Sequence, residues 1–141
     1  MAYDNDNIFA KILRGEIPAI KVFEDAATFA FMDIMPRGTG HMLVIPKAPM
    51  RNLLDADPAA LAACVQTAQK LAVAAQDALG ADGITLQQFS EEAGGQEVFH
   101  LHFHVIPRFA GQALGRPGIM GDMEAIAATA EKIRAKLGAG A

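Results

Sequence analysis

The chain has 141 residues and a formal net charge of −4, with twelve Lys and Arg against sixteen Asp and Glu. Hydrophobic residues make up 52% of it, which excludes a low-complexity disordered protein, because such chains have too little apolar surface to bury. The acidic balance excludes a general nucleic-acid-binding protein, which needs a basic face to neutralise phosphates. The length suits one domain over residues 1–141.

Cysteine content and hydropathy give an expectation about the compartment. The single cysteine, Cys64, excludes an internal disulfide and a cysteine-based zinc site. The first residues lack the basic and then apolar layout of a signal peptide, and no apolar run approaches the roughly 18 residues that span a bilayer. We therefore expect a soluble, cytoplasmic protein with no membrane partner.

The first third of the chain predicts a short helix and three strands. Asn5 or Asp6 can cap the helix, and Gly15 ends it. The strands are expected at residues 19–24, 29–32 and 41–45. A loop rich in proline and glycine separates the last two strands, and Pro46 closes the third.

A long helix is predicted from Asp57 to Leu79. Asp57 is a good N-cap, Pro58 suits the first helical position, and Gly80 lies just past the end. An apolar stripe recurs at helical spacing along it, formed by Leu61, Cys64, Val65, Ala68, Leu71, Ala75 and Leu79.

Two further strands and a final helix are predicted in the second half. The strands cover residues 84–89 and 98–106, and a glycine-rich stretch then leads to a helix over 122–137. Strand runs interrupted by helices that cover one face favour an α+β fold with a five-stranded, mainly antiparallel sheet. The long helix, the short N-terminal helix and the extra C-terminal helix complete this expectation.

Three histidines alternate with apolar residues along the predicted strand 98–106. Since side chains alternate between faces of a strand, His100, His102 and His104 would share one face. One interpretation is a metal site, but residues four apart on a strand lie roughly 13 Å apart, so such a site would use two of the three with His41. The other is nucleophilic catalysis by the middle imidazole, with its neighbours holding a charged group.

The run His100-Leu101-His102-Phe103-His104-Val105-Ile106 resembles the signature of the histidine triad (HIT) family of nucleotide-binding proteins. Further segments are similar to the family's N-terminal helix, its second and third strands and its turn before the triad, at residues 7–12, 15–18, 31–34, 41–47 and 94–96. The motif-bearing core spans residues 4–108, and the glycine-rich loop and helix at 109–141 lie outside it. The resemblance implies a HIT-like fold.

The resemblance also implies an activity. In the family the middle histidine, here His102, attacks the α-phosphate of a purine nucleotide and forms a covalent nucleotidyl-histidine that water cleaves. His100 and His104 would orient the nucleophile, contact phosphate oxygens and assist the leaving group, and His41 would support the triad. The expected substrates are purine nucleoside 5′-phosphoramidates or related nucleotide conjugates, with no metal and no cofactor.

The family pattern assigns further substrate contacts. The purine pocket would be walled by Ile8, Phe9, Ile12, Phe31 and Leu43, and Asp33 would bind the ribose hydroxyls. Around the turn before the triad, the candidates are Ser90, Gly95, Gln96 and Val98, with backbone N–H groups near Gly95 and His102 for the phosphate. The resemblance further implies a homodimer formed by residues 83–89 and 57–79.

Departures from the family pattern leave alternatives open. Some members hold a structural zinc with a Cys-x-x-Cys pair, but Asn7 and Ala10 occupy those positions, so we expect none. His104 keeps histidine where a nucleotide-transferring branch has glutamine, which favours hydrolysis. Ser90 lies where the family often has asparagine, and the Glu97 carboxylate would repel a nearby phosphate. The alternatives are a nucleotide-binding regulatory or scaffold protein with little turnover, a dinucleoside polyphosphate hydrolase, and the metalloprotein.

Overall fold

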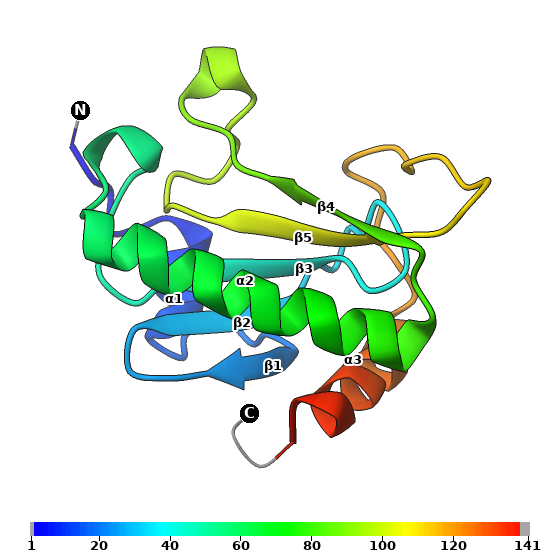
Figure 1. Ribbon diagram of the computed structural model, residues 1–141. Helices are drawn as coiled ribbons and strands as arrows, with labels where there is room; N and C mark the ends of the chain where they lie inside the picture. The colour runs from blue at the N-terminus through cyan, green and yellow to red at the C-terminus, as the bar shows by residue number, and fades with distance from the viewer. Residues whose placement is uncertain (1, 139–141) are drawn as a thin grey trace.

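The computed structural model describes residues 2–138, and within them it contains one five-stranded sheet and three α-helices (Figure 1). The strands are β1 (Lys21–Glu24), β2 (Thr28–Met32), β3 (Met42–Pro46), β4 (Gly83–Gln87) and β5 (Phe103–Arg108). All pairings are antiparallel, in the order β1-β2-β3-β5-β4. The predicted α+β fold is confirmed.

Helix α2 (Pro58–Leu79) lies across one face of the sheet (Figure 1). Pro58 stands in its first turn as predicted, and Gly80 ends it in the left-handed conformation, with φ 68°. Leu71 of α2 packs in the main core with Leu101 and Val105, and none of these three side chains is exposed. Helix α3 (Met123–Leu137) packs against α2 and β1 and adds Ile126, Ala130 and Ile133 to this core.

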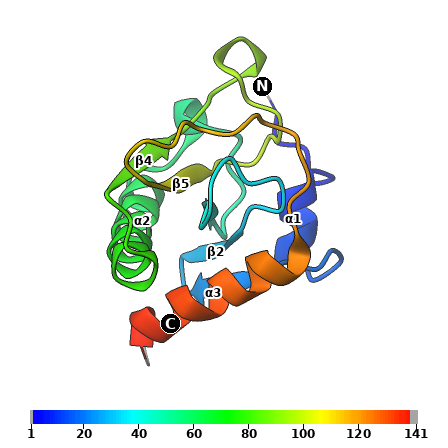
Figure 2. The same ribbon diagram turned by 90° about the vertical axis from the view of Figure 1, so that its right-hand side faces the viewer.

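Helix α1 (Ile8–Leu13) lies on the side of the sheet away from α2 (Figure 2). It contributes to a second apolar cluster, formed by Phe9, Phe31, Leu43 and Ile45. The cap expected at Asn5 or Asp6 is wrong, because Asn7 Oδ1 accepts from Ala10 N at 2.9 Å. The Asp6 amide instead donates to the Asp4 carboxylate, which closes a turn before the helix begins.

The strand predicted over residues 98–106 begins only at Phe103, and this changes how the triad is held. Residues before Phe103 have no partner in the sheet, because pairing with β3 begins at Phe103 and pairing with β4 begins at His104. The Leu101 amide donates to Met50 O at 2.8 Å, outside the sheet. His100 and His102 therefore lie on a bent segment that enters β5, and His104 is the one triad histidine on the strand.

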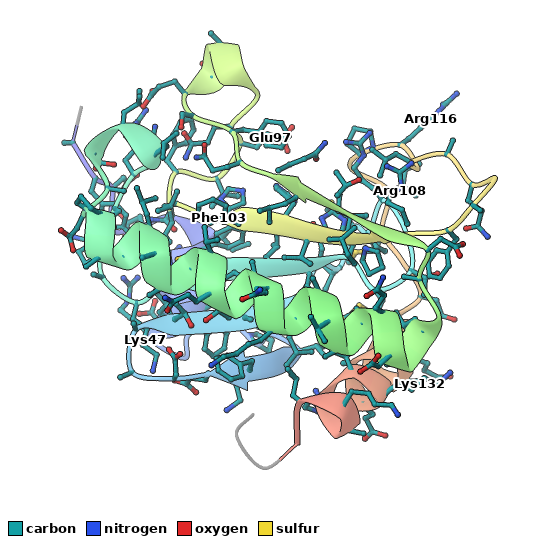
Figure 3. All side chains as sticks on the ribbon, viewed as in Figure 1. Lys47, Glu97, Phe103, Arg108, Arg116 and Lys132 are labelled. Atoms are coloured by element: carbon teal, nitrogen blue, oxygen red, sulfur yellow. The ribbon has the colours of Figure 1, made fainter. Side chains whose placement is uncertain are left out.

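Two loops that are far apart in the sequence lie side by side at one end of the sheet (Figure 2). The Gly115 amide donates to Arg37 O at 2.8 Å, and Arg37 Nε donates to Gly115 O at 2.9 Å. The Gly121 amide donates to Ile34 O at 2.9 Å. Segment 109–122 thereby holds the loop that precedes His41, and Figure 3 labels Arg108 at the end of β5 and Arg116 within this segment.

None of the helices described in residues 2–138 is both long and apolar enough to cross a membrane. Two short 3₁₀ turns, η1 (Leu53–Asp55) and η2 (Glu92–Gly94), complete the elements.

Candidate active site

His102 is held in one tautomer by its own backbone. Its Nδ1 lies 2.7 Å from the carbonyl oxygen of His100, which can only accept, so Nδ1 carries the proton. The remaining nitrogen, Nε2, therefore presents a lone pair. Burial lowers the pKa of His102 below its ordinary value, because the charged form is poorly solvated. A neutral imidazole with one oriented lone pair is the form that attacks phosphorus.

His100 is fixed at both ring nitrogens. Its Nε2 lies 2.8 Å from Pro46 O and donates to it, so Nδ1 is an acceptor and receives the Tyr3 hydroxyl at 2.5 Å. The ring is fully buried, and burial lowers its pKa to about 4. With neither ring nitrogen free, His100 reaches the site through its carbonyl, which orients His102.

His41 and His104 form a hydrogen-bonded pair. The Arg37 amide donates to His41 Nδ1 at 3.0 Å, so the His41 proton is on Nε2. That Nε2 donates to His104 Nδ1 at 2.9 Å, and the proton of His104 is consequently on its own Nε2. His104 thus offers an N–H to a ligand beside the His102 ring, whose centroid is 5.0 Å away.

Both members of this pair are held neutral. Burial, together with the positive charge of Arg37 and then the nearby His102, lowers the pKa of His41 to about 4. Burial and the neighbouring His102, His41 and Arg37 lower the pKa of His104 to about 3. The pair therefore works near neutral pH as a chain of hydrogen-bond donors.

One group of side chains has the composition of a metal site. Asp33, His41 and His104 place their ligand atoms within 4.8 Å of one another. A ligating nitrogen must offer a lone pair, however, and the Arg37 amide leaves His41 with a proton on the nitrogen that faces His104. This arrangement favours the hydrogen-bonded relay. Both ring nitrogens of His100 and Nδ1 of His102 are directed at other partners.

The apolar residues predicted to wall a purine pocket fall into two groups. Phe9, Phe31 and Leu43 are buried together, and Ile12 and Val98 pack against them. The Phe9 ring meets His102 edge to face at 4.9 Å, which places this cluster beside the predicted nucleophile. Ile8 is 46% exposed instead, and it lines a separate pocket of about 310 Å³ with Val98 and Glu97.

The Asp33 carboxylate uses one of its two oxygens in a hydrogen bond within the protein. Its Oδ1 accepts the Met35 amide at 2.8 Å and closes a turn, while Oδ2 lies 3.5 Å from His41 Nε2. Burial raises its pKa above the ordinary value. One carboxylate oxygen beside the relay is thus left for a polar ligand, so a ribose contact remains a prediction.

The turn before the triad is held by the Gln96 side chain. Its amide makes four hydrogen bonds, accepting from Asn52 and the Glu91 amide and donating to Arg51 O and Val98 O. The Ser90 hydroxyl likewise donates to Gln88 and accepts from the Leu53 amide. Both side chains brace the loop, and a direct contact of either with substrate stays a prediction.

Gly95 follows this turn in the left-handed region, with φ 96°. A Cβ there would meet the Phe89 ring at 3.4 Å, so glycine suits both the conformation and the space. The Phe89 ring in turn meets His104 at 5.5 Å, which connects the turn to the relay.

Several residues that hold the site were missed in the sequence. Arg51 forms a two-pronged ion pair with Glu91, at 2.8 and 2.9 Å, and lowers the pKa of that carboxyl. Glu91 adopts a positive φ of 65°, which is unusual outside glycine. Tyr3 and Arg37 act on His100 and His41. Sequence spacing does not predict these contacts, since Arg51 and Glu91 are 40 residues apart, Tyr3 and His100 are 97 apart, and Arg37 acts through its backbone amide.

Comparisons with known proteins show which family this chain resembles. The model of the HIT domain family matches residues 14–111. The crystal structure of a Hit-like protein involved in cell-cycle regulation from Bartonella henselae has a TM-score of 0.92 and 53% identity, covering 96% of this chain and 99% of that one. A histidine triad nucleotide-binding protein from Candida albicans has a TM-score of 0.68 and 32% identity, covering 94% and 97%.

Among sequence relatives, Adenylylsulfatase HINT3 of Arabidopsis thaliana is 35% identical over 127 residues, which are 86% of this chain and 64% of that protein. The chain thus spans somewhat less than two thirds of this plant relative. The family model covers most of the chain, and the triad, its supporting histidine and the sheet are all in place. The chain belongs to the HIT domain family.

Proposed function

We propose that this protein is a nucleotide hydrolase that cleaves the α-phosphate bond of purine nucleoside 5′-phosphoramidates or related nucleotide conjugates. The observation that carries the proposal is the fixed tautomer of His102, whose Nδ1–H is held by His100 O at 2.7 Å. This leaves Nε2 as an oriented, neutral nucleophile. The plant relative that is an adenylylsulfatase supports a class of nucleotide conjugates broader than phosphoramidates.

The proposed reaction has two displacements at phosphorus. His102 Nε2 attacks the α-phosphorus and forms a P–N bond, while the bond to the leaving group breaks and its electron pair departs with that group. Water then attacks the same phosphorus, the P–N bond breaks, and its electron pair returns to Nε2. The proton that this water loses balances the proton that the leaving group takes up. The His100 carbonyl stabilises the positive charge on the modified ring through Nδ1–H.

The remaining residues have supporting roles in this proposal. His104 Nε2–H donates to a phosphate oxygen or to the departing atom, and His41 keeps it in that tautomer. The cluster of Phe9, Phe31 and Leu43 packs against the base, and Asp33 Oδ2 accepts from a ribose hydroxyl. The base would then lie beside His102, because Phe9 contacts both.

Intact-protein mass spectrometry tests the proposal directly. The protein is mixed with adenosine 5′-phosphoramidate or an activated AMP ester and quenched within milliseconds in mild base. We expect an added AMP mass on the parent chain and none on His102→Ala. The Ile119→Ala variant, changed on an exposed residue of the 109–122 segment, is the matched control and should carry the adduct.

Product release is followed in the same samples. If His102→Ala released AMP as fast as the parent, the covalent route would be wrong. AMP release by the parent without an adduct would place the slow step before the intermediate, and the His102→Ala comparison would still decide the role of His102.

A second candidate function is nucleotide binding with little turnover. It is favoured by the side chains of Ser90 and Gln96, whose polar atoms are already bonded within the loop, and by the exposed Glu97 carboxylate near that loop (Figure 3). A carboxylate close to the phosphate opposes added negative charge. Calorimetry showing tight AMP binding, with no hydrolysis of any nucleotide conjugate, would select this function.

We also propose that the protein is a homodimer. In the sheet, β4 has β5 on one side only, so its outer edge presents unpaired backbone groups. Leu86 on this strand is 48% exposed. Pairing of two β4 edges about a twofold axis would bury both features at once.

A further inference from the structure

We propose that Tyr3 is a positioning residue of the active site, which acts on the nucleophile His102 through His100. The inference rests on the proposed function for its catalytic consequence and on observed contacts for its geometry. Tyr3 lies outside the residues that the family model matches, and it is the only tyrosine in the chain.

The contact with His100 is a direct hydrogen bond, and its donor and acceptor can be assigned. Pro46 O can only accept, so it takes the His100 Nε2 proton and leaves a lone pair on Nδ1. The Tyr3 hydroxyl, 2.5 Å from Nδ1, must therefore be the donor. The two rings also meet edge to face, with centroids 5.6 Å apart. Tyr3 thus fixes both the tautomer and the tilt of a fully buried ring.

The next contact passes this constraint to the nucleophile. The carbonyl of His100 accepts the His102 Nδ1 proton at 2.7 Å. Residues 98–102 lie ahead of β5 and have no ladder partner, so sheet hydrogen bonds do not fix this carbonyl. What fixes it is the His100 ring, anchored by Pro46 and Tyr3, together with the Leu101 amide on Met50 O. A looser His100 would let its carbonyl turn and free the His102 proton.

The N-terminal segment is itself anchored, which makes Tyr3 a fixed partner. An Arg51 guanidinium nitrogen donates to Ala2 O at 3.4 Å, and Asn7 Nδ2 donates to Asp4 O at 2.8 Å. Arg51 also stacks on the Phe99 ring at 4.3 Å, next to the triad. Residues on both sides of Tyr3 are therefore connected to elements that border the site.

The test varies the donor strength of this one hydroxyl. Tyr3→Phe removes it, and biosynthetic incorporation of 3-fluorotyrosine strengthens it as a donor at this single position, because the chain has no other tyrosine. Nitrogen-15 NMR of labelled histidine measures the ring-nitrogen resonances of His100 and His102. We expect the His100 Nδ1 resonance to move in opposite directions in the two proteins, and the His102 Nδ1 proton to exchange faster with water in Tyr3→Phe.

Steady-state kinetics of the Tyr3→Phe variant give the second measurement. We expect Tyr3→Phe to lower kcat about fivefold, the effect of one neutral hydrogen bond, with KM unchanged because Tyr3 does not touch substrate. Asp6→Asn, an exposed change in the same segment, should leave kcat and both histidine resonances as in the parent. A melting temperature of Tyr3→Phe close to that of the parent shows that the fold is intact.

The outcomes separate this inference from the proposed function. Unchanged His100 and His102 signals in both Tyr3 proteins, or an unchanged kcat with altered signals, would overturn the role of Tyr3. A rise in KM without a change in kcat would overturn it as well, since it would make Tyr3 a substrate contact. Lack of turnover in the parent protein would instead contradict the proposed function, while the NMR comparison would still test the positioning contact.

Discussion

The histidines of the site are neutral because burial lowers the pKa of all four, and every ring nitrogen except Nε2 of His102 has an assigned partner or proton. His41 and His104 have pKa values lowered to about 4 and about 3, against about 6.5 in an unfolded chain. The Arg37 amide points at His41 Nδ1, so an added proton has no place to go without breaking a hydrogen bond. The four imidazoles therefore keep one protonation state across neutral pH.

This burial predicts how stability depends on pH. A histidine with a depressed native pKa binds fewer protons than the unfolded chain below pH 6.5, so the free energy of unfolding falls as pH drops from about 6.5 towards about 4. Each such histidine contributes roughly 1.4 kcal/mol per pH unit at most. Urea unfolding at a series of pH values measures the slope. His104→Gln should give a shallower slope, and equal slopes would contradict the assignment.

The relay from His41 to His104 predicts a kinetic effect at a residue that need not touch substrate. His41→Leu keeps much of the volume but removes the Nε2–H that fixes His104. We expect kcat to fall about 100-fold, within the range for general acid–base groups, with a smaller change in KM. Steady-state kinetics at pH 7 measure this. Ile119→Ala, a change at an exposed residue, provides the comparison and should keep the parental kcat. A His41→Leu variant with parental kcat would exclude the relay.

At the scale of elements, segment 109–122 braces the loop that carries the Arg37 amide. Gly121 donates to Ile34 O, and a Cβ there would lie 2.9 Å from Pro36 Cδ and 2.9 Å from the Ile126 side chain. Pro36 directly precedes Arg37, so any shift of this contact moves the amide that fixes His41.

Gly121→Ala is therefore expected to cost about 1–3 kcal/mol in the free energy of unfolding, the usual range for overpacking, and to lower kcat. Chemical denaturation and steady-state assays measure the two effects. Gly94→Ala is the matched control, because a Cβ at Gly94 meets nothing within 4 Å and its φ is not positive. Equal behaviour of the two variants would show that the segment does not brace the loop.

Local signals predicted most of the elements, and they placed both ends of α2 correctly. Asp57, Pro58 and Gly80 stand at the ends of α2 where capping rules put them, although Asp57 makes no side-chain cap hydrogen bond. The start of β5 was wrong because alternation of apolar residues continues through 98–102, whereas pairing depends on where β3 and β4 end. Contacts across long separations were also out of reach: His41 and His104 are 63 residues apart, and Tyr3 and His100 are 97 apart.

At the scale of the whole molecule, exposed apolar residues indicate where a second copy of the chain would bind. Thr67 of α2 bonds to Thr28 of β2, so one flank of the helix faces β2. Val65 is two residues away, about 200° around the helix, and therefore lies on the side of α2 away from this contact. Val65 is 47% exposed although its place in the helical stripe predicts burial. Its exposure, like that of Leu86 on β4, fits a surface that a second copy covers.

A charge at this surface should therefore separate the subunits. Light scattering of the parent chain should give about twice the 14.9 kDa of one chain, and Leu86→Glu should give a mass near 14.9 kDa, because pairing two β4 edges would bring two carboxylates together about the twofold axis. Ile119→Glu adds the same charge at an equally exposed residue of segment 109–122 and should leave the mass doubled. A parent mass near 14.9 kDa, or a Leu86→Glu variant that stays dimeric at micromolar concentration, would contradict pairing through β4.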